Sequence, residues 1–277
     1  MAKPEPAIIW PARMLLIGCG NMGGAMLARW LDLGLSPEKV AVVRPSGKAV
    51  AAGVQVQTRL DEAVAPGTLV LLGCKPQQLA EVAATLSGLI GEGVVLVSIL
   101  AGVPIERLRA AFPEAGAIIR CMPNMPVRIG KGVTILRAAD DTAAQVRSAV
   151  SGVCSGLGLV EWLEDEHLFD AATALAGCGP AFVYRFIAAL GQAGAELGLD
   201  PASAARMALM TVEGAALSAA AGEDPPCKMA DAVASKGGMT REGLNVLDRP
   251  DGLAALLEET LRAARDRGAA LAALSDK

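Results

Sequence analysis

The sequence predicts a doubly wound α/β sheet followed by an all-α domain, and three observations support this division. Short runs of Val, Ile and Leu, bounded by Gly or Pro, alternate with helical patterns through the first part of the chain. A glycine-rich segment follows the first of these runs and opens a helix. After about Glu164 the strand patterns stop and long Ala-rich helices follow. We therefore expect a sheet domain over 1–164 and a helical domain over 165–277.

The first domain is expected to hold parallel strands joined by helical crossovers, because apolar runs and helical patterns alternate along it. The opening residues 1–12 contain several prolines and charges and lack a signal-peptide core, so we expect a flexible extension there. The expected strands are Met14–Ile17, Val40–Val43, Leu69–Leu72, Val94–Ser98, Ala117–Cys121, Val133–Leu136 and Leu157–Glu161. The expected helices between them are Met22–Leu33, Leu79–Leu89, Ile105–Phe112 and Thr142–Cys154.

The second domain is expected to consist of helices, several of which begin at a proline, a residue that the first helical turn accepts. These helices are Pro180–Leu197, Pro201–Ala221, Pro225–Ala234 and a last one from Gly252 to near the end, with another starting at Thr240. Ala, Met and Leu occupy many of their faces. A unit this small and apolar would bury those faces against a second copy, so we expect an intertwined homodimer, with higher assemblies of dimers left open.

Composition excludes several classes of protein. The chain has 277 residues, is 53% hydrophobic and carries a net charge of −4, which argues against disorder and against general nucleic-acid binding. Its six cysteines are scattered and it has a single histidine, so no metal site is expected. No apolar run reaches the roughly 18 residues that span a bilayer. We expect a cytoplasmic protein with reduced cysteines and no membrane partner.

A glycine-rich motif follows the first expected strand directly and leads into a helix. Gly18 allows a tight turn, Gly20 lets the backbone approach a pyrophosphate, and Gly23 lets helix and strand pack closely. The helix N-terminus then faces the anion. This placement predicts a dinucleotide-binding, Rossmann-type domain. The expected cofactor contacts in the motif are Gly18, Gly20, Asn21, Met22 and Gly23.

The end of the second expected strand favours NADPH as the cofactor. An NAD site usually has an acid there, whereas this chain has Arg44 and Ser46, with Lys48 nearby and no acid until Asp61. Arg44 can bind a 2′-phosphate through two hydrogen bonds, with help from Ser46. The alternative is a solvated basic loop. We expect NADPH, with NADH as a weaker donor.

Two further segments follow strands at the edge where open sheets bind ligands. Cys74, Lys75 and Pro76 come after Leu69–Leu72, and Ala101 comes shortly after the next strand. Small residues there suit the nicotinamide arm of a cofactor. Lys75 is expected to approach the cofactor, with an ordinary surface lysine as the alternative.

A glycine turn in the helical domain has the form of an anion site. Ser235, Gly237, Gly238, Met239 and Thr240 lie where one helix ends and another starts. Consecutive free backbone N–H groups at such a place suit a carboxylate. The alternative is an ordinary turn with a threonine cap.

Five segments together resemble the pyrroline-5-carboxylate reductase family, in order and in spacing, from about Met14 to the C-terminus. They are IGCGNMGGAM (Ile17–Met26), CKPQQL (Cys74–Leu79), IRCMPNMP (Ile119–Pro126), AGCGPAF (Ala176–Phe182) and SKGGMTREGL (Ser235–Leu244). The resemblance implies a helical dimerisation domain that completes the partner's active site. It also implies NADPH-dependent reduction of the cyclic imine L-1-pyrroline-5-carboxylate to L-proline, the last step of proline biosynthesis.

The resemblance also implies roles for individual residues. Ser235 and the backbone at Gly238, Met239 and Thr240 would hold the substrate carboxylate, and the Thr240 hydroxyl would lie beside the ring nitrogen as the catalytic group. Asn124 would help to shape the pocket where the two domains meet.

Departures from the family pattern leave alternatives open. The departures are Lys236 for Pro, Ala234 for Ser or Thr, Ala176 and Cys178 for Ser, Phe182 for a frequent Tyr, and no Asn near Leu60. A reductase of a different cyclic imine is one alternative. A 3-hydroxyacid-type dehydrogenase is another, although the helix Pro180–Leu197 lacks the lysine that such enzymes use. A non-catalytic NADPH sensor would not need the carboxylate turn.

Overall fold

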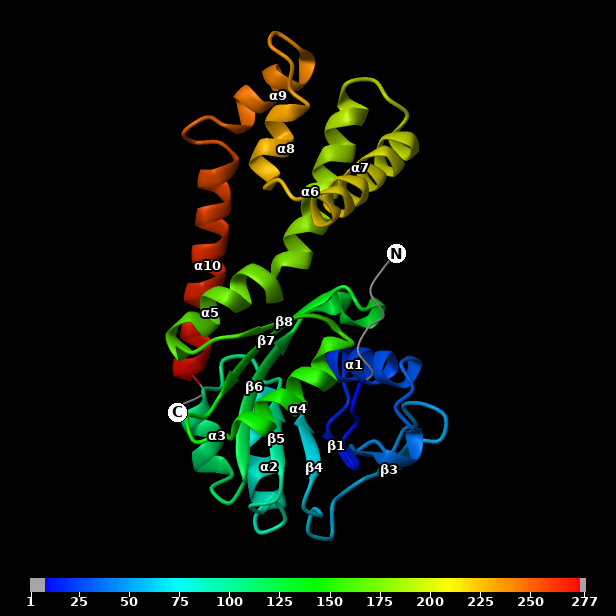
Figure 1. The fold of residues 1–277 in the computed structure, drawn as a ribbon, viewed down its shortest axis with the longest axis vertical. Helices are drawn as coiled ribbons and strands as arrows, with labels where there is room; N and C mark the ends of the chain where they lie inside the picture. The colour runs from blue at the N-terminus through cyan, green and yellow to red at the C-terminus, as the bar shows by residue number, and fades with distance from the viewer. Residues whose placement is uncertain (1–7, 275–277) are drawn as a thin grey trace. The chain divides into compact units, whose positions relative to one another are not determined.

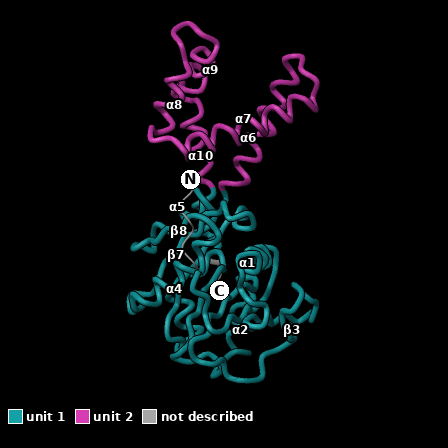
Figure 2. The backbone as a smooth tube through the Cα atoms, turned by 45° about the vertical axis from the view of Figure 1, so that its right-hand side comes forward, with its two compact units in different colours: residues 1–178, 264–277 teal, residues 179–263 magenta. Residues whose placement is uncertain are grey.

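The computed structural model describes residues 8–274, which form two compact units (Figures 1 and 2). The first unit comprises the chain up to residue 178 together with the segment from 264 onward, and the second comprises 179–263. Of the expected extension over 1–12, residues 1–7 lie outside the described part of the chain. From Ile8 the chain is described, and it leads into the first strand.

The second unit begins at residue 179, later than the boundary expected at residue 164, where the strand patterns stop. Phe169 is only 1% exposed within the first unit, so the segment after residue 164 still packs with the sheet domain. The last turns of the final helix belong to the same unit, where a Cβ added at Gly268 would lie 3.4 Å from the carboxyl carbon of Asp170. Composition alone does not reveal such packing.

The first unit contains a sheet of eight strands in the order β3-β2-β1-β4-β5-β6-β7-β8 (Figure 1). The bounds are β1 Arg13–Ile17, β2 Val40–Val43, β3 Gln55–Gln57, β4 Thr68–Leu72, β5 Val95–Ser98, β6 Ala117–Pro123, β7 Gly132–Ala138 and β8 Gly158–Trp162. The expected parallel pairing is confirmed from β3 to β6, whereas β7 runs antiparallel to β6. The reason is that the 124–131 connection is too short for a crossover. Strand β3 was not predicted, because its sequence QVQ is polar.

Helices cover both faces of this sheet, as the sequence predicts for a doubly wound fold. Along β1, Met14 and Leu16 join one buried cluster and Leu15 and Ile17 join another, because alternate residues face opposite sides. Helices α1 (Asn21–Asp32) and α4 (Ala144–Ser155) supply the first cluster, and α2 (Leu79–Leu86) and α3 (Ile105–Ala111) the second. Strands buried on both faces account for their continuous apolar sequences.

Short helical turns complete the first unit. They are η1 Pro37–Lys39, η2 Pro76–Gln78, η3 Met125–Ile129, η4 Glu166–Leu168, the helix α5 Phe169–Ala172 and the π-helical turn η5 Thr173–Gly177. The sequence predicted none of these turns. The last three precede the first long helix without a break in helical backbone. The Gly and Pro residues at 177–180 favour a helix start there, but the helical path begins earlier.

The second unit is built from helices and has little core of its own. Its elements are α6 Gly179–Glu196, α7 Pro201–Ala221, α8 Pro226–Ala232, α9 Met239–Leu247 and the first part of α10 Leu253–Leu274. Helices α6 and α7 approach closely through small residues, since a Cβ added at Gly191 would lie 3.2 Å from the Cα of Ala205. Gly191, Ala204 and Ala208 are the buried residues of the unit.

One helical stretch, Glu166–Glu196, is long and apolar enough to cross a bilayer by length and composition, with a mean hydropathy of 1.4. The sequence prediction concerned uninterrupted apolar runs, whereas this helix qualifies by its mean hydropathy over an 18-residue window. Within this helix, only 11% of the most apolar 18-residue window is buried in the single chain. The exposed side chains include Val183, Tyr184, Phe186 and Leu190.

The indole of Trp30 gives a test of the packing between α1 and α4. Trp30 is 1% exposed and its Nε1 donates to the carbonyl oxygen of Val153, 3.0 Å away. Trp30→Phe leaves that buried carbonyl unpaired, so we expect a loss of about 1–3 kcal/mol in the free energy of unfolding.

Urea denaturation followed by circular dichroism measures this loss. Trp162→Phe is the matched control, because its indole donates to Ser151 Oγ at a partly buried position in the edge strand β8. Equal losses in the two variants would contradict a special role for the Trp30 contact.

Candidate functional site

A cleft of about 570 Å³ opens at the carboxyl ends of β1, β2 and β4. Open parallel sheets bind ligands at this edge, where the strand order reverses direction. Six of the residues predicted to bind the cofactor line the cleft: Gly18, Gly20, Arg44, Ser46, Cys74 and Lys75. Cys19, between the first two, lines it as well. The sequence therefore located the cleft.

The glycine motif forms the turn between β1 and α1. Gly18 has φ +81°, and a Cβ added to it would lie 2.9 Å from the carbonyl oxygen of Gly73, so no other residue fits. Gly20 is the N-cap of α1 and no side chain caps this helix. A Cβ at Gly20 would meet no atom within 4 Å, which leaves open space in front of the helix N-terminus. The first amides of α1 are therefore available to an anion.

The end of β2 presents a cation to the same cleft. Arg44 is half-buried and its backbone N–H donates to the carbonyl oxygen of Gln57. Ser46 lies in the following turn, where its hydroxyl accepts from the Lys48 N–H at 3.4 Å. No acid follows β2 at this point, so the cleft suits an anionic group on the ribose rather than a free 2′-hydroxyl.

The two cysteines of the cleft are protonated at neutral pH. Burial raises the pKa of the Cys19 thiol, and the nearby Arg44 guanidinium acts in the opposite direction. Cys19 and Arg44 both line the cleft. Burial raises the pKa of Cys74 to about 11. Neither thiol is poised for nucleophilic chemistry.

The sequence analysis missed a wall of the cleft formed after β3. Thr58 and Arg59 line it there, and Arg59 pairs with Asp61 at 2.7 Å. Glu81 on α2 also lines the cleft. Because β3 was not recognised, Thr58 and Arg59, which follow it directly, were not considered. The place of β3 beside β2 in the strand order is the signal that would have indicated them.

Other predicted cofactor residues lie beside the cleft rather than in its lining. Asn21, Met22 and Gly23 form the first turn of α1. Pro76 starts η2, where the Lys75 N–H donates to Gln78 Oε1 at 3.1 Å. Ala101 is exposed in the turn after β5.

The predicted carboxylate turn lies in the second unit, between α8 and α9. Gly237 has φ +71°, and the Gly238 N–H donates to the carbonyl oxygen of Ser235 at 2.9 Å. A Cβ at Gly238 would lie 2.5 Å from Ser235 Oγ and 3.1 Å from the Ser235 carbonyl oxygen, so a larger residue here would have to displace the Ser235 side chain. An ion pair of 2.6 Å between Arg241 and Asp231 holds the two helices of the turn together.

The first turn of α9 is open to solvent. Gly238 is its N-cap, and no side chain caps it, so the threonine-cap alternative is not what the structure has. Met239 is 93% exposed, and Thr240 is exposed as the second helical residue. The N–H groups of this turn, with the Ser235 and Thr240 hydroxyls beside them, suit a small anion.

Asn124 is a buried residue of the first unit whose amide binds backbone on both sides. Its Nδ2 donates to the carbonyl oxygen of Ala176 and its Oδ1 accepts from the Val133 N–H, each at 2.9 Å. The side chain thus ties the end of β6 to β7 and to the π-helical turn. Its contribution is to fix the shape of this region rather than to offer a free hydrogen-bonding group.

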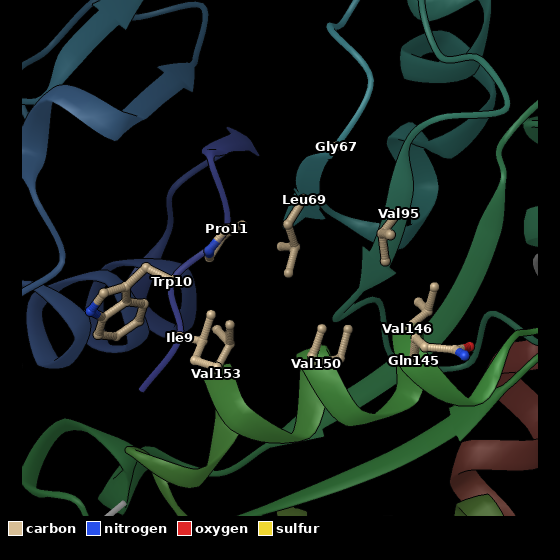
Figure 3. Close-up of a pocket in the computed structure, with 11 residues that line it drawn as sticks. Ile9, Trp10, Pro11, Gly67, Leu69, Val95, Gln145, Val146, Val150 and Val153 are labelled. Atoms are coloured by element: carbon tan, nitrogen blue, oxygen red, sulfur yellow. The ribbon is translucent and has the colours of Figure 1, made fainter. Parts of the chain in front are cut away.

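A second cavity, of about 290 Å³, lies at the amino ends of β4 and β5 and has no titratable or nucleophilic side chain in its lining (Figure 3). Leu69 and Val95 at the starts of β4 and β5 face Val146 and Val150 of α4 across it. The lining is apolar apart from the Gln145 amide and the Trp10 indole nitrogen. No cluster of metal-binding side chains occurs among residues 8–274 either.

Comparisons with known proteins agree with this geometry. A family model described as pyrroline-5-carboxylate reductase dimerisation matches residues 166–271. A model described as NADP oxidoreductase, coenzyme F420-dependent, matches residues 13–102. Both predicted domains are thus recognised independently.

Similarity to curated relatives extends over nearly the whole chain. A pyrroline-5-carboxylate reductase from Pseudomonas aeruginosa is 34% identical over 266 residues, covering 94% of this chain and 97% of the relative. One from Synechocystis is 36% identical and covers 91% and 95%.

Solved structures give the same result. A pyrroline-5-carboxylate reductase from Coxiella burnetii has a TM-score of 0.84 at 26% identity, covering 94% of this chain and 98% of that one. A pyrroline carboxylate reductase from Plasmodium falciparum, solved with NADP bound, has a TM-score of 0.79 at 25% identity and the same coverage. This chain belongs to the pyrroline-5-carboxylate reductase family.

Proposed function

We propose that this protein reduces L-1-pyrroline-5-carboxylate to L-proline, with NADPH as the hydride donor. The observation that carries the proposal is the presence, in one member of this family, of a cationic dinucleotide cleft and an amide-lined carboxylate turn. Its curated relatives carry the name of this activity over more than nine-tenths of the chain. The Plasmodium falciparum neighbour was solved with NADP bound.

The cofactor site is proposed to use backbone amides for the pyrophosphate and Arg44 for the 2′-phosphate. Gly18, Gly20 and Gly23 leave the start of α1 open to the pyrophosphate, together with the neighbouring Asn21 and Met22. Arg44 and Ser46 would hold the extra phosphate, and this charge pairing favours NADPH over NADH. On the nicotinamide side, the proposed contacts are Cys74, Lys75, Pro76 and Ala101.

The substrate site is proposed to lie around the turn 235–240. The Ser235 hydroxyl and the amides at Gly237, Gly238 and Met239 would bind the substrate carboxylate. The Thr240 hydroxyl would accept from the iminium N–H and orient the ring. Asn124 would support the pocket by holding the backbone around it.

The chemistry asks little of the side chains. A protonated cyclic imine is already electrophilic, so the protein's task is to orient the ring and to exclude water. NADPH, when bound, supplies the hydride. The half-buried, protonated thiols of Cys19 and Cys74 are proposed to take no part in proton transfer, and the exposed Thr240 hydroxyl is proposed to orient the ring nitrogen.

A second copy of the chain is proposed to cover the apolar faces of the helical unit, giving a homodimer that higher assemblies of dimers could extend. Exposed side chains on α7 include Met207, Leu209 and Met210, in addition to those on α6. The family model for this region describes dimerisation. This occupant also accounts for the apolar stretch Glu166–Glu196 without a membrane. We propose a cytoplasmic enzyme without a nucleic-acid partner.

The rival functions are separated by one assay. Loss of NADPH absorbance is followed with pyrroline-5-carboxylate and then with six-membered cyclic imines, and gain of NADPH absorbance is followed with NADP+ and 3-hydroxyacids. A preference for the six-membered imine would assign a different substrate. NADPH binding without turnover of any imine would indicate a sensor.

Replacement of Thr240 tests its assignment to the substrate. Thr240→Ala should lower kcat about a hundredfold, because the ring nitrogen loses its partner, and should leave the Kd for NADPH nearly unchanged. Thr240→Ser, which keeps the hydroxyl, is the control and should retain most of the turnover. Wild-type kinetics in the alanine variant would remove Thr240 from the mechanism.

Replacement of Arg44 tests the phosphate site. Arg44→Ala should raise the KM for NADPH about tenfold or more, since a charge-assisted pair is worth roughly 1.5–3 kcal/mol, and should change the KM for NADH little. Steady-state kinetics with both cofactors measure this, NADH being the internal control. Equal effects on both would contradict the assignment.

The oligomeric state tests the proposal that a second copy of the chain buries the apolar faces of α6 and α7. Sedimentation velocity without detergent should show a dimer or a multiple of it at micromolar concentration. Phe186→Lys, which places a charge on the exposed face of α6, should shift the distribution towards monomer. A wild-type protein that remains entirely monomeric would exclude the homodimer.

A further inference from the structure

Two buried arginines face one another across the β6–β7 pair. Arg120 and Arg137 are register partners in this antiparallel pair, so their side chains share one face of the sheet. Their side chains are only 6% and 12% exposed. Like charges directly opposite on a sheet repel, and they repel more strongly when buried. A shared counter-ion is therefore required.

Glu166 provides this counter-ion from the η4 turn. Its Oε1 lies 2.5 Å from Arg120 Nη1, and its Oε2 lies 3.8 Å from Arg137 Nε. The Nε atoms of both arginines are buried without a hydrogen bond among the described residues. Asp140, 90% exposed, pairs with Arg137 at 2.6 Å but not with Arg120. Glu166 is thus the acid that both guanidinium groups share.

The same carboxylate also holds the start of α3. Its Oε1 accepts from the Ile105 N–H, the first amide of that helix, at 3.3 Å. The N-cap of α3 is Pro104, and no side-chain cap comes from within the helix. Glu166 therefore satisfies one of the free amides from 61 residues away in the sequence. The turn after β5, which contains Ala101, ends at this contact.

Phe169 extends the network along the connector. The Arg120 Cζ atom lies 3.8 Å above the centre of the Phe169 ring, and this ring is 1% exposed. A cation–π contact in a buried position is a strong one. Glu166 and Phe169 together fix the segment that leads, through α5 and η5, into α6.

We propose that Glu166 is a positioning residue for hydride transfer. It joins the turn after β5, on the proposed nicotinamide side, to the connector that precedes the substrate-binding unit. Loss of its charge would leave both buried guanidinium groups without their shared partner and would free the two segments to move separately. This role rests on the proposed function, and it requires no contact between Glu166 and either ligand.

Glu166→Gln tests the kinetic part of this inference. The amide keeps the size and the acceptor for the Ile105 N–H but removes the charge. We expect kcat to fall about ten- to a hundredfold, as slight misplacement does, with little change in the KM for NADPH. The deuterium isotope effect on kcat with 4-deuterated NADPH should rise, because hydride transfer becomes more rate-limiting. A lower melting temperature with unchanged kcat and isotope effect would overturn the proposal.

Glu164→Gln is the matched control. Glu164 lies two residues earlier on the same connector and forms an ion pair of 2.5 Å with Arg147, but it is 74% exposed. Its loss should leave kcat and the isotope effect unchanged. If Glu166→Gln does not fold, Glu166→Gln/Arg137→Gln removes one charge of each sign and should show the same kinetic defect. Wild-type kcat in that double variant would also overturn the proposal.

Hydrogen exchange tests the coupling without turnover. NADPH should slow amide exchange both in 99–105 and in 166–172 of the wild-type protein, and Glu166→Gln should abolish the response of 166–172 alone. An unchanged response in the variant, or no response of 166–172 in the wild type, would refute the coupling. Absence of turnover with every cyclic imine would instead refute the proposed function, so the two failures are distinguishable.

Discussion

The close approach of the chain at Gly18 is the constraint on which the cofactor cleft depends. A Cβ at this position would lie 2.9 Å from the Gly73 carbonyl oxygen, and the backbone is in the left-handed region. Only glycine lets β1 turn this sharply into α1 beside the end of β4. The turn directs the free amides of α1 into the cleft, where they and Arg44 provide the positive potential for a phosphorylated dinucleotide.

A similar principle operates in the helical unit, where Gly237 and Gly238 turn the chain between α8 and α9. In both places glycine leaves backbone amides free for the proposed anion, so the proposed sites do not depend on a cluster of charged side chains. This explains how a chain with a net charge of −4 can recognise an anionic cofactor and an anionic substrate. Lys236 adds an exposed cation beside the second of these turns.

The two units differ in how they are stabilised. The sheet unit has large apolar clusters on both faces, whereas the helical unit buries only small residues and leaves Tyr184, Phe186 and Met210 exposed. Exposed apolar faces of this extent are typical of an interface rather than of a free surface. The buried network around Glu166 adds order at the connector, where the sheet unit ends and the helices begin.

The sequence by itself indicated most of the strands and helices and the position of the glycine turn, and it led to the proposals that Arg44 binds a phosphate and that the turn 235–240 binds a carboxylate. These features depend on local patterns: apolar periodicity, glycine spacing and proline at helix starts. The same patterns place the ends of predicted helices within a few residues, as for Pro201–Ala221, which is observed with the same bounds.

Only the tertiary structure decided the remaining features, because they depend on partners distant in sequence. The polar strand β3 exists through its pairing with β2, and it brings Thr58 and Arg59 to the cleft. The direction of β7 follows from a short connection, and the unit boundary follows from the burial of Phe169. In the sequence Glu166 follows two other acids, Glu164 and Asp165, and only the fold places it beside two arginines from neighbouring strands.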